Sequence, residues 1–72
     1  MMILKFEVDV PLVKRTMIEQ GITAPELASQ AGITYQTLRR FLNNKKYGQS
    51  LRTCRKIARA LQIEVETFVR AK

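Results

Sequence analysis

The sequence predicts a small, mainly α-helical domain in which two short helices are joined by a glycine turn and a β-strand precedes the bundle. Apolar residues recur at helical spacing in several segments, Ser and Thr stand where helices would start, and residues 3–10 alternate as a strand does. At 72 residues the chain is expected to be one domain, residues 1–72, because so short a chain buries only about 60% of its unfolded surface.

The N-terminal segment is predicted to be a strand over residues 3–10. Its apolar side carries Leu4, Phe6, Val8 and Val10, and charged residues stand between them. Pro11 has a fixed φ and no N–H to donate, so it suits the first turn of a helix over residues 12–20, which Gly21 ends. The inward positions of that helix are Val13 and Met17, with Leu12 and Ile18 as further candidates.

Residues 24–43 are predicted to form a helix-turn-helix unit. Thr23 and Glu26 have the spacing of a capping box, which starts the first helix at Ala24. Gly32 ends it by accepting a left-handed backbone, and Ala28 is small enough for a close helix crossing. Thr34 is placed to cap a second helix over residues 35–43. The core of the unit is expected to contain Leu27, Ala31, Ile33, Leu38 and Phe41.

Ser50 can cap a further helix over residues 51–62, which follows a polar loop. Its inward stripe is expected to be Leu51, Cys54, Ile57, Ala58 and Leu61. The apolar residues of the tail, residues 63–72, fit both the spacing of a helix and the alternation of a strand. We favour a short helix there, with Val65, Phe68 and Val69 on its apolar face, but part of the tail could instead pair with the N-terminal strand, which needs a partner.

Positive charge is concentrated in the second half of the chain. The formal net charge is +7, yet residues 1–33 contain three basic and four acidic residues, whereas residues 34–72 contain ten basic and two acidic ones. From Arg39 to Arg59 there are eight Lys or Arg and no Asp or Glu. This distribution favours a polyanionic partner over the simpler alternative of a solvated basic face that keeps a small protein in solution.

Several classes of function are not expected from the composition. With one Cys and no His, the chain lacks an internal disulfide, a usual zinc site and histidine chemistry, so no metal, cofactor or catalytic residue is predicted. Cys54 is expected to be a small core residue. Because no apolar run reaches the ~20 residues of a membrane helix and no signal peptide is evident, we expect a soluble cytoplasmic protein without membrane contact.

A set of spaced residues gives the chain a resemblance to a known family. These residues are Thr23, Glu26, Leu27, Ala28, Gly32, Ile33, Thr34, Leu38, Phe41 and Asn43, followed by a basic loop and by Ser50, Leu51 and the run Ile57 to Leu61. Over residues 12–68 the chain resembles the Cro/CI (lambda-repressor-like, Xre-type) helix-turn-helix family. The resemblance implies a bundle of about five helices, sequence-specific binding to double-stranded DNA, and a homodimer on an inverted repeat.

The family pattern makes residues 35–40 the exposed part of a recognition helix. Gln36 and Thr37 are the first candidates for base reading, because an amide can pair with the N6 and N7 edge of adenine and a threonine can bond either base type. Tyr35 could reach a sugar or base, or simply pack at the turn. Arg40 shares the face of Gln36 and could read guanine or hold a phosphate, whereas Arg39 is placed with the phosphate contacts.

The remaining candidates are expected to hold DNA phosphates. Ser50 and Arg52 lie at a helix N-terminus, where free N–H groups and the helix dipole favour an anion. The expected phosphate contacts are Thr23, Thr34, Arg39, Lys45, Lys46, Tyr47, Ser50 and Arg52. At Thr23 the contact is weakened because Pro25 lacks a donor and Glu26 repels phosphate. The basic loop could instead be solvated.

These residues predict a transcriptional regulator, a repressor or Cro-like protein of prokaryotic or phage type that is associated with the nucleoid through DNA. The alternative is an antitoxin-like or accessory module that holds a protein partner through its apolar strand or tail. An architectural protein without sequence preference is a third option, which Gln36 and Thr37 disfavour. If Phe6, Val8 and Phe68 are all buried, little surface remains for a hetero-partner. The strand edge could also form the homodimer.

Overall fold

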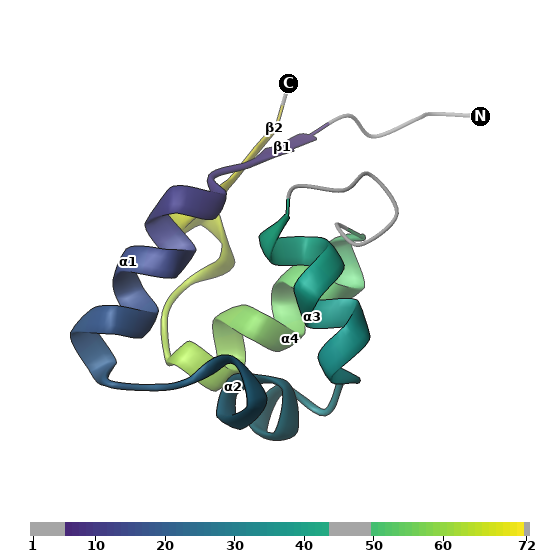
Figure 1. Ribbon diagram of the computed structural model, residues 1–72. Helices are drawn as coiled ribbons and strands as arrows, with labels where there is room; N and C mark the ends of the chain where they lie inside the picture. The colour runs from purple at the N-terminus through teal and green to yellow at the C-terminus, as the bar shows by residue number, and fades with distance from the viewer. Residues whose placement is uncertain (1–5, 44–49, 72) are drawn as a thin grey trace.

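A computed structural model describes residues 6–43 and 50–71 of the chain, and Figure 1 shows their arrangement. The elements are β1 Phe6–Val8, α1 Val10–Gln20, α2 Ala24–Ala31, α3 Tyr35–Leu42, α4 Leu51–Leu61, the 3-10 helix η2 Val65–Thr67 and β2 Val69–Ala71. The mainly α-helical fold is confirmed. Within the described residues there are four α-helices rather than about five, because the tail forms one 3-10 turn and a strand.

The strand predicted over residues 3–10 is shorter in the structure. Its first residues, up to Lys5, lie outside the described residues, and the strand ends at Val8. Asp9 is the reason, because its side chain accepts a hydrogen bond from the Leu12 N–H (3.2 Å) and caps α1. Val10 is therefore the first residue of α1 and is buried (5% exposed), and Pro11 stands in the first turn as predicted.

The tail pairs with the N-terminal strand, so the favoured helical prediction is wrong for residues 69–71 and the alternative is right. β1 and β2 are antiparallel, with Phe6 opposite Ala71 and Val8 opposite Val69. The Asp9 N–H donates to the Phe68 carbonyl (2.7 Å) and closes the pairing. The two-stranded sheet lies at the end of α1 far from α2 (Figure 1).

The other helix boundaries agree closely with the prediction. α2 begins at Ala24 and ends before Gly32 as expected. α3 stops at Leu42, one residue early, since Asn43 serves as its cap, and α4 stops at Leu61 because Gln62 adopts the left-handed conformation. The Gln20 side-chain amide donates to the Leu61 carbonyl (2.7 Å), so α1 satisfies a backbone group at the end of α4.

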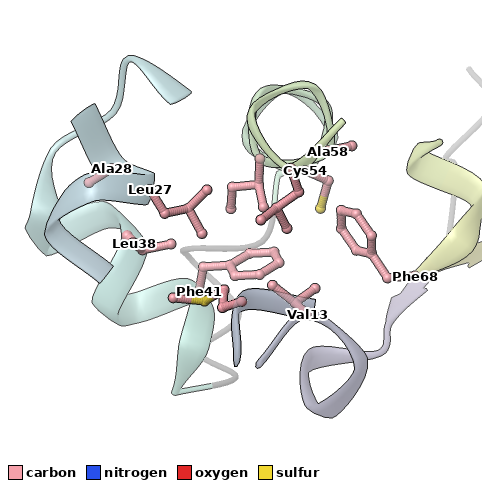
Figure 2. Packing of buried hydrophobic residues seen from close by; sticks show 11 residues of the cluster. Val13, Leu27, Ala28, Leu38, Phe41, Cys54, Ala58 and Phe68 are labelled. Atoms are coloured by element: carbon pink, nitrogen blue, oxygen red, sulfur yellow. The ribbon is translucent and has the colours of Figure 1, made fainter. Parts of the chain in front are cut away.

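The core is built from all four helices and Phe68 (Figure 2). The fully buried large side chains are Val13, Leu27, Leu38, Phe41, Cys54, Ile57, Leu61 and Phe68. Ala31, Ile33 and Leu51 were predicted inside but are half-buried, because Ala31 and Leu51 stand at helix ends and Ile33 lies in the turn between α2 and α3. Ile18, a further candidate for the core, is 80% exposed, because α1 buries the face of Val13 and Met17.

Candidate nucleic-acid interface

The turn between α2 and α3 depends on a left-handed residue at Gly32, whose φ is +70°. The Gly32 N–H donates to the Ser29 carbonyl (3.2 Å) and the Ile33 N–H to the Ala28 carbonyl (3.0 Å). Both bonds satisfy carbonyl groups at the end of α2, as in a Schellman-type cap. Ala28 is almost fully buried beside this turn. The backbone thus turns sharply, and α3 starts beside α2 and packs against it.

The outer face of α3 is polar. Because Leu38 and Phe41 are fully buried, the opposite side of the helix faces solvent. At about 100° per residue, Gln36 lies about 200° from Leu38 and about 140° from Phe41 around the axis, so it occupies the middle of the exposed side. Arg39 and Arg40 are exposed on either side of it. This face carries amide and guanidinium groups, which are the side-chain groups that pair with base edges in a major groove.

Tyr35 is 49% exposed, so about half of the side chain is open to a sugar or base and the other half is covered at the turn. The Arg39 guanidinium lies over its ring, 5.9 Å from the centroid. A cation held against an aromatic face loses less rotamer freedom when it later binds an anion. Arg39 and Tyr35 therefore form one unit at the edge of the α3 face.

Thr37 is half-buried, unlike its neighbour Gln36. Its N–H donates to the Thr34 side-chain oxygen (3.0 Å), and its own hydroxyl oxygen accepts from the Thr34 hydroxyl (2.9 Å). The Thr37 hydroxyl proton is still available as a donor. Thr37 thus contributes to the cap of α3, and a hydrogen bond that it donated to DNA would use its remaining proton.

The N-termini of α3 and α4 share one arrangement. At α4 the Ser50 hydroxyl donates to the Thr53 hydroxyl (2.9 Å), and the Thr53 N–H donates to the Ser50 oxygen (3.1 Å), as Thr34 and Thr37 do at α3. Neither helix has an acidic residue in its first turn. The positive end of each helix dipole is therefore not neutralised by a carboxylate, which favours an external anion.

The N-terminus of α2 differs because its own carboxylate occupies it. Glu26 accepts from the Thr23 N–H (3.0 Å) and from the Thr23 hydroxyl (2.8 Å), which completes the predicted capping box. These hydrogen bonds hold the pKa of Glu26 below its usual value. Both donors of Thr23 are thus used inside the protein, so of the three helices capped by Ser or Thr, α2 is the least suited to hold a phosphate.

The exposed cations complete the surface. Arg40 and Arg52 are exposed, and neither is in an ion pair within residues 6–43 and 50–71. The predicted phosphate contacts Lys45, Lys46 and Tyr47 lie outside the described residues. Sequence reasoning missed Thr53, although Ser50 and Thr53 repeat the spacing of Thr34 and Thr37 and could have identified it.

Two other kinds of site were sought in the described part of the chain. There, no three His, Cys, Asp or Glu side chains are grouped so that they could hold a metal ion. No described helix has the length and apolar character needed to span a membrane.

Comparisons with known proteins agree with this geometry. A family model described as the Cro/C1-type HTH DNA-binding domain matches residues 13–72. Among solved structures, the chain is similar to the N-terminal DNA-binding domain of SinR from Bacillus subtilis, with 26% sequence identity and a TM-score of 0.72. That match covers 81% of this chain and 84% of the SinR chain. No curated protein sequence matches the chain.

Proposed function

Since the chain belongs to the Cro/C1-type helix-turn-helix DNA-binding family, we propose that it is a sequence-specific repressor or Cro-like regulator of prokaryotic or phage type. The broader statement, that it is a DNA-binding transcription regulator, follows from the family and from its likeness to the SinR domain. The observation that carries the finer proposal is the polar α3 face centred on Gln36, beside two helix N-termini without a carboxylate.

In this proposal α3 lies in the major groove. The Gln36 amide pairs with the N6 and N7 edge of adenine, and Arg40 on the same face reads guanine or holds a phosphate. Thr37 donates its free hydroxyl proton or contacts a thymine methyl. Arg39, whose guanidinium lies over the Tyr35 ring, contacts a phosphate of the DNA backbone.

Phosphates of the flanking backbone bind at the starts of α3 and α4. Thr34 and Ser50 mark these two helix ends, and Arg52 adds a full charge in the first turn of α4. Lys45, Lys46 and Tyr47 remain proposed contacts along the same strand. Thr23 is the weakest member of the set, because its hydroxyl and N–H already donate to Glu26.

The proposed target is an inverted repeat bound by a homodimer, because two-fold symmetry in the protein is matched by two-fold symmetry in the operator. The regulator would act in the cytoplasm, at the nucleoid. The antitoxin-like alternative depends on an apolar surface at the strand and tail. Phe68 is fully buried, and Phe6 and Val8 are half-buried against the core, which supports the regulator over that alternative.

The test is selection of bound duplexes from a random DNA pool at about 150 mM salt, where nonspecific attraction between exposed charges is largely screened. Enrichment of an inverted repeat with half-sites about one helical turn apart is the expected result. A pool that stays random despite binding would indicate backbone contacts alone. Bound DNA carrying a single, unrepeated half-site would keep the sequence-reading function and reject the dimer.

A further inference from the structure

Tyr35 and Arg39 contact each other on the outer side of α3, at the edge of the proposed base-reading face. The two residues are four positions apart, a spacing that places side chains one above the other on a helix. The Arg39 guanidinium lies 5.9 Å from the centroid of the Tyr35 ring, within the range of roughly 6 Å for a cation–π interaction. The contact is formed by α3 alone and needs no ligand.

Tyr35 lies outside the core of the bundle. Its side chain is 49% exposed, whereas α3 turns Leu38 and Phe41 inward. The Thr34 hydroxyl caps the helix without the Tyr35 side chain. Within the described part of the chain, the one interaction of the Tyr35 ring or hydroxyl is the contact with Arg39. The ring can therefore be replaced without removing a core or capping contact of α3.

The shape of a guanidinium group lets it hold two partners at once. The group is planar, and its N–H donors point outward in that plane, so an aromatic ring can cover one face while the edge stays free. Arg39 is exposed, and it is in no ion pair within residues 6–43 and 50–71. A phosphate can therefore be bound by the edge of the guanidinium without separating its face from the Tyr35 ring.

Arg40 provides an internal comparison. It is the next residue of α3 and is also exposed, but the residue four positions before it is Gln36, which has no ring. In the described part of the chain, Arg40 makes no cation–π contact. A free arginine loses much of its rotamer freedom when it binds an anion, and that loss weakens binding. Arg39 has already lost part of this freedom on the ring, whereas Arg40 has not.

We propose that Tyr35 is a positioning residue for DNA binding, whose ring holds one face of the Arg39 guanidinium so that the N–H edge meets a backbone phosphate. This inference deepens the proposed function, on whose phosphate contact at Arg39 it rests. The competing role for Tyr35 is a direct contact with a sugar or base through its hydroxyl. The two roles differ in what they require, because positioning needs the ring and Arg39, whereas a direct contact needs the hydroxyl and not Arg39.

Binding to random-sequence duplexes at about 50 to 200 mM salt measures the effect, because a phosphate contact does not depend on sequence. Tyr35→Leu should raise the dissociation constant about two- to fivefold per protomer and leave the salt slope unchanged, since every charge remains. Tyr35→Phe keeps the ring and should bind as the wild type does. Arg39→Ala should reduce the slope by about 0.9 per protomer, because one phosphate contact is lost.

A double-variant comparison shows whether the ring acts through Arg39. Tyr35→Leu should cause no further loss in a protein that already carries Arg39→Ala. The matched control is Tyr35→Leu in the Arg40→Ala protein, where the full two- to fivefold loss should return. Equal losses in both backgrounds would overturn the proposal, as would a wild-type affinity for Tyr35→Leu. Weaker binding by Tyr35→Phe would assign the contact to the hydroxyl, and an unchanged slope for Arg39→Ala would remove the phosphate contact.

Proton NMR of the protein without DNA reads the stacking itself. The ring current of Tyr35 should shift the resonances of the Arg39 methylene group next to the guanidinium upfield. Tyr35→Phe should keep this shift and Tyr35→Leu should abolish it, while thermal unfolding verifies that both variants fold. An unshifted wild-type resonance would contradict the proposal. Because these measurements use random duplexes or no DNA, failure of sequence reading in the selection experiment and failure of this inference are separate results.

Discussion

Phe68 meets Phe41 edge to face, with the ring centroids 6.3 Å apart and the ring planes at 87° (Figure 2). Phe41 belongs to α3, and Phe68 lies between η2 and β2, so the contact joins the proposed recognition helix to the C-terminal segment. Both rings are fully buried. The C-terminal segment, just before it joins the sheet, therefore contributes to the position of α3 through this aromatic pair.

Phe68→Leu should lower the free energy of unfolding by about 1–2 kcal/mol, since Leu fills most of the site but loses the edge-to-face contact and some volume. Chemical denaturation measures this change. Phe6→Leu is the matched control, because Phe6 is only half-buried and should lose less. Equal losses for the two variants would show that the Phe41 contact adds nothing to ordinary burial.

The C-terminal segment shows where sequence reasoning reaches its limit. Val65, Phe68 and Val69 fit a helical face, whereas Ile63, Val65 and Val69 fit a strand alternation, so local pattern leaves the two open. The outcome depends on β1, which is unpaired unless residues 69–71 join it, and on the Asp9 N–H, which donates to Phe68. Both partners are distant in the sequence, so the periodicity of the tail alone does not reveal them.

Most of the helix-turn-helix could be predicted, because its determinants are local. The Thr23 and Glu26 box, Gly32 and the apolar spacing of Leu38 and Phe41 each act within a few residues. Contacts between individual side chains were harder to predict from the sequence. The half-burial of Thr37 and the stacking of Arg39 on Tyr35 depend on rotamers and on hydroxyl pairing that spacing alone does not specify. The roles of individual residues in DNA binding remain predictions.

Gln62→Gly should stabilise the protein by about 0.5–1 kcal/mol. Gln62 is the one described non-glycine residue with positive φ (+59°), a conformation that disfavours a Cβ atom. Its N–H still caps α4 in the variant, so only backbone strain is removed, less the larger chain entropy of glycine in the unfolded state. Thermal or chemical unfolding measures the gain.

Gly32→Ala is the converse control. The φ of Gly32 is +70°, and an added Cβ would meet no atom within 4 Å. Any loss of stability therefore comes from backbone strain rather than from a steric clash. We expect a loss of about 1 kcal/mol. If Gln62→Gly also destabilises the protein, the glutamine side chain must contribute more to the end of α4 than its strain removes.

Cys54 should make stability fall at alkaline pH. Burial raises the pKa of its thiol to about 11 from an ordinary value of 9.0. Between these values the unfolded chain loses the thiol proton and the folded chain keeps it, so stability present below pH 9.0 is lost as the pH rises toward about 11. At pH 10 the loss should be about 1 kcal/mol.

The comparison that isolates this thiol is wild type against Cys54→Ala, each unfolded by denaturant at pH 8 and pH 10. Cys54→Ala is less stable throughout, because it leaves a small cavity, but its pH dependence should be weaker by the amount that the thiol contributes. Lysine and tyrosine titration affects both proteins alike and cancels in the difference. Parallel pH profiles would mean that the folded thiol ionises as readily as the unfolded one.

Gln36→Ala and Arg52→Ala should weaken DNA binding in different ways. Gln36 lies in the middle of the exposed α3 face, so its loss should relax preference at one base pair by about 1–3 kcal/mol while leaving binding to random DNA nearly unchanged. Arg52 lies in the first turn of α4 beside a free helix dipole, so its loss should weaken all DNA alike.

Salt dependence separates the two effects, because only phosphate contacts release counterions. If each protomer neutralises about four phosphates, the dimer's log affinity should fall against log salt with a slope near −7. Arg52→Ala should reduce that slope by about 2 per dimer, and Gln36→Ala should leave it unchanged. An equal loss on selected and random DNA for Gln36→Ala would remove that residue from base reading, because a base contact must distinguish sequences. An unchanged slope for Arg52→Ala would likewise mean that the arginine contacts no phosphate.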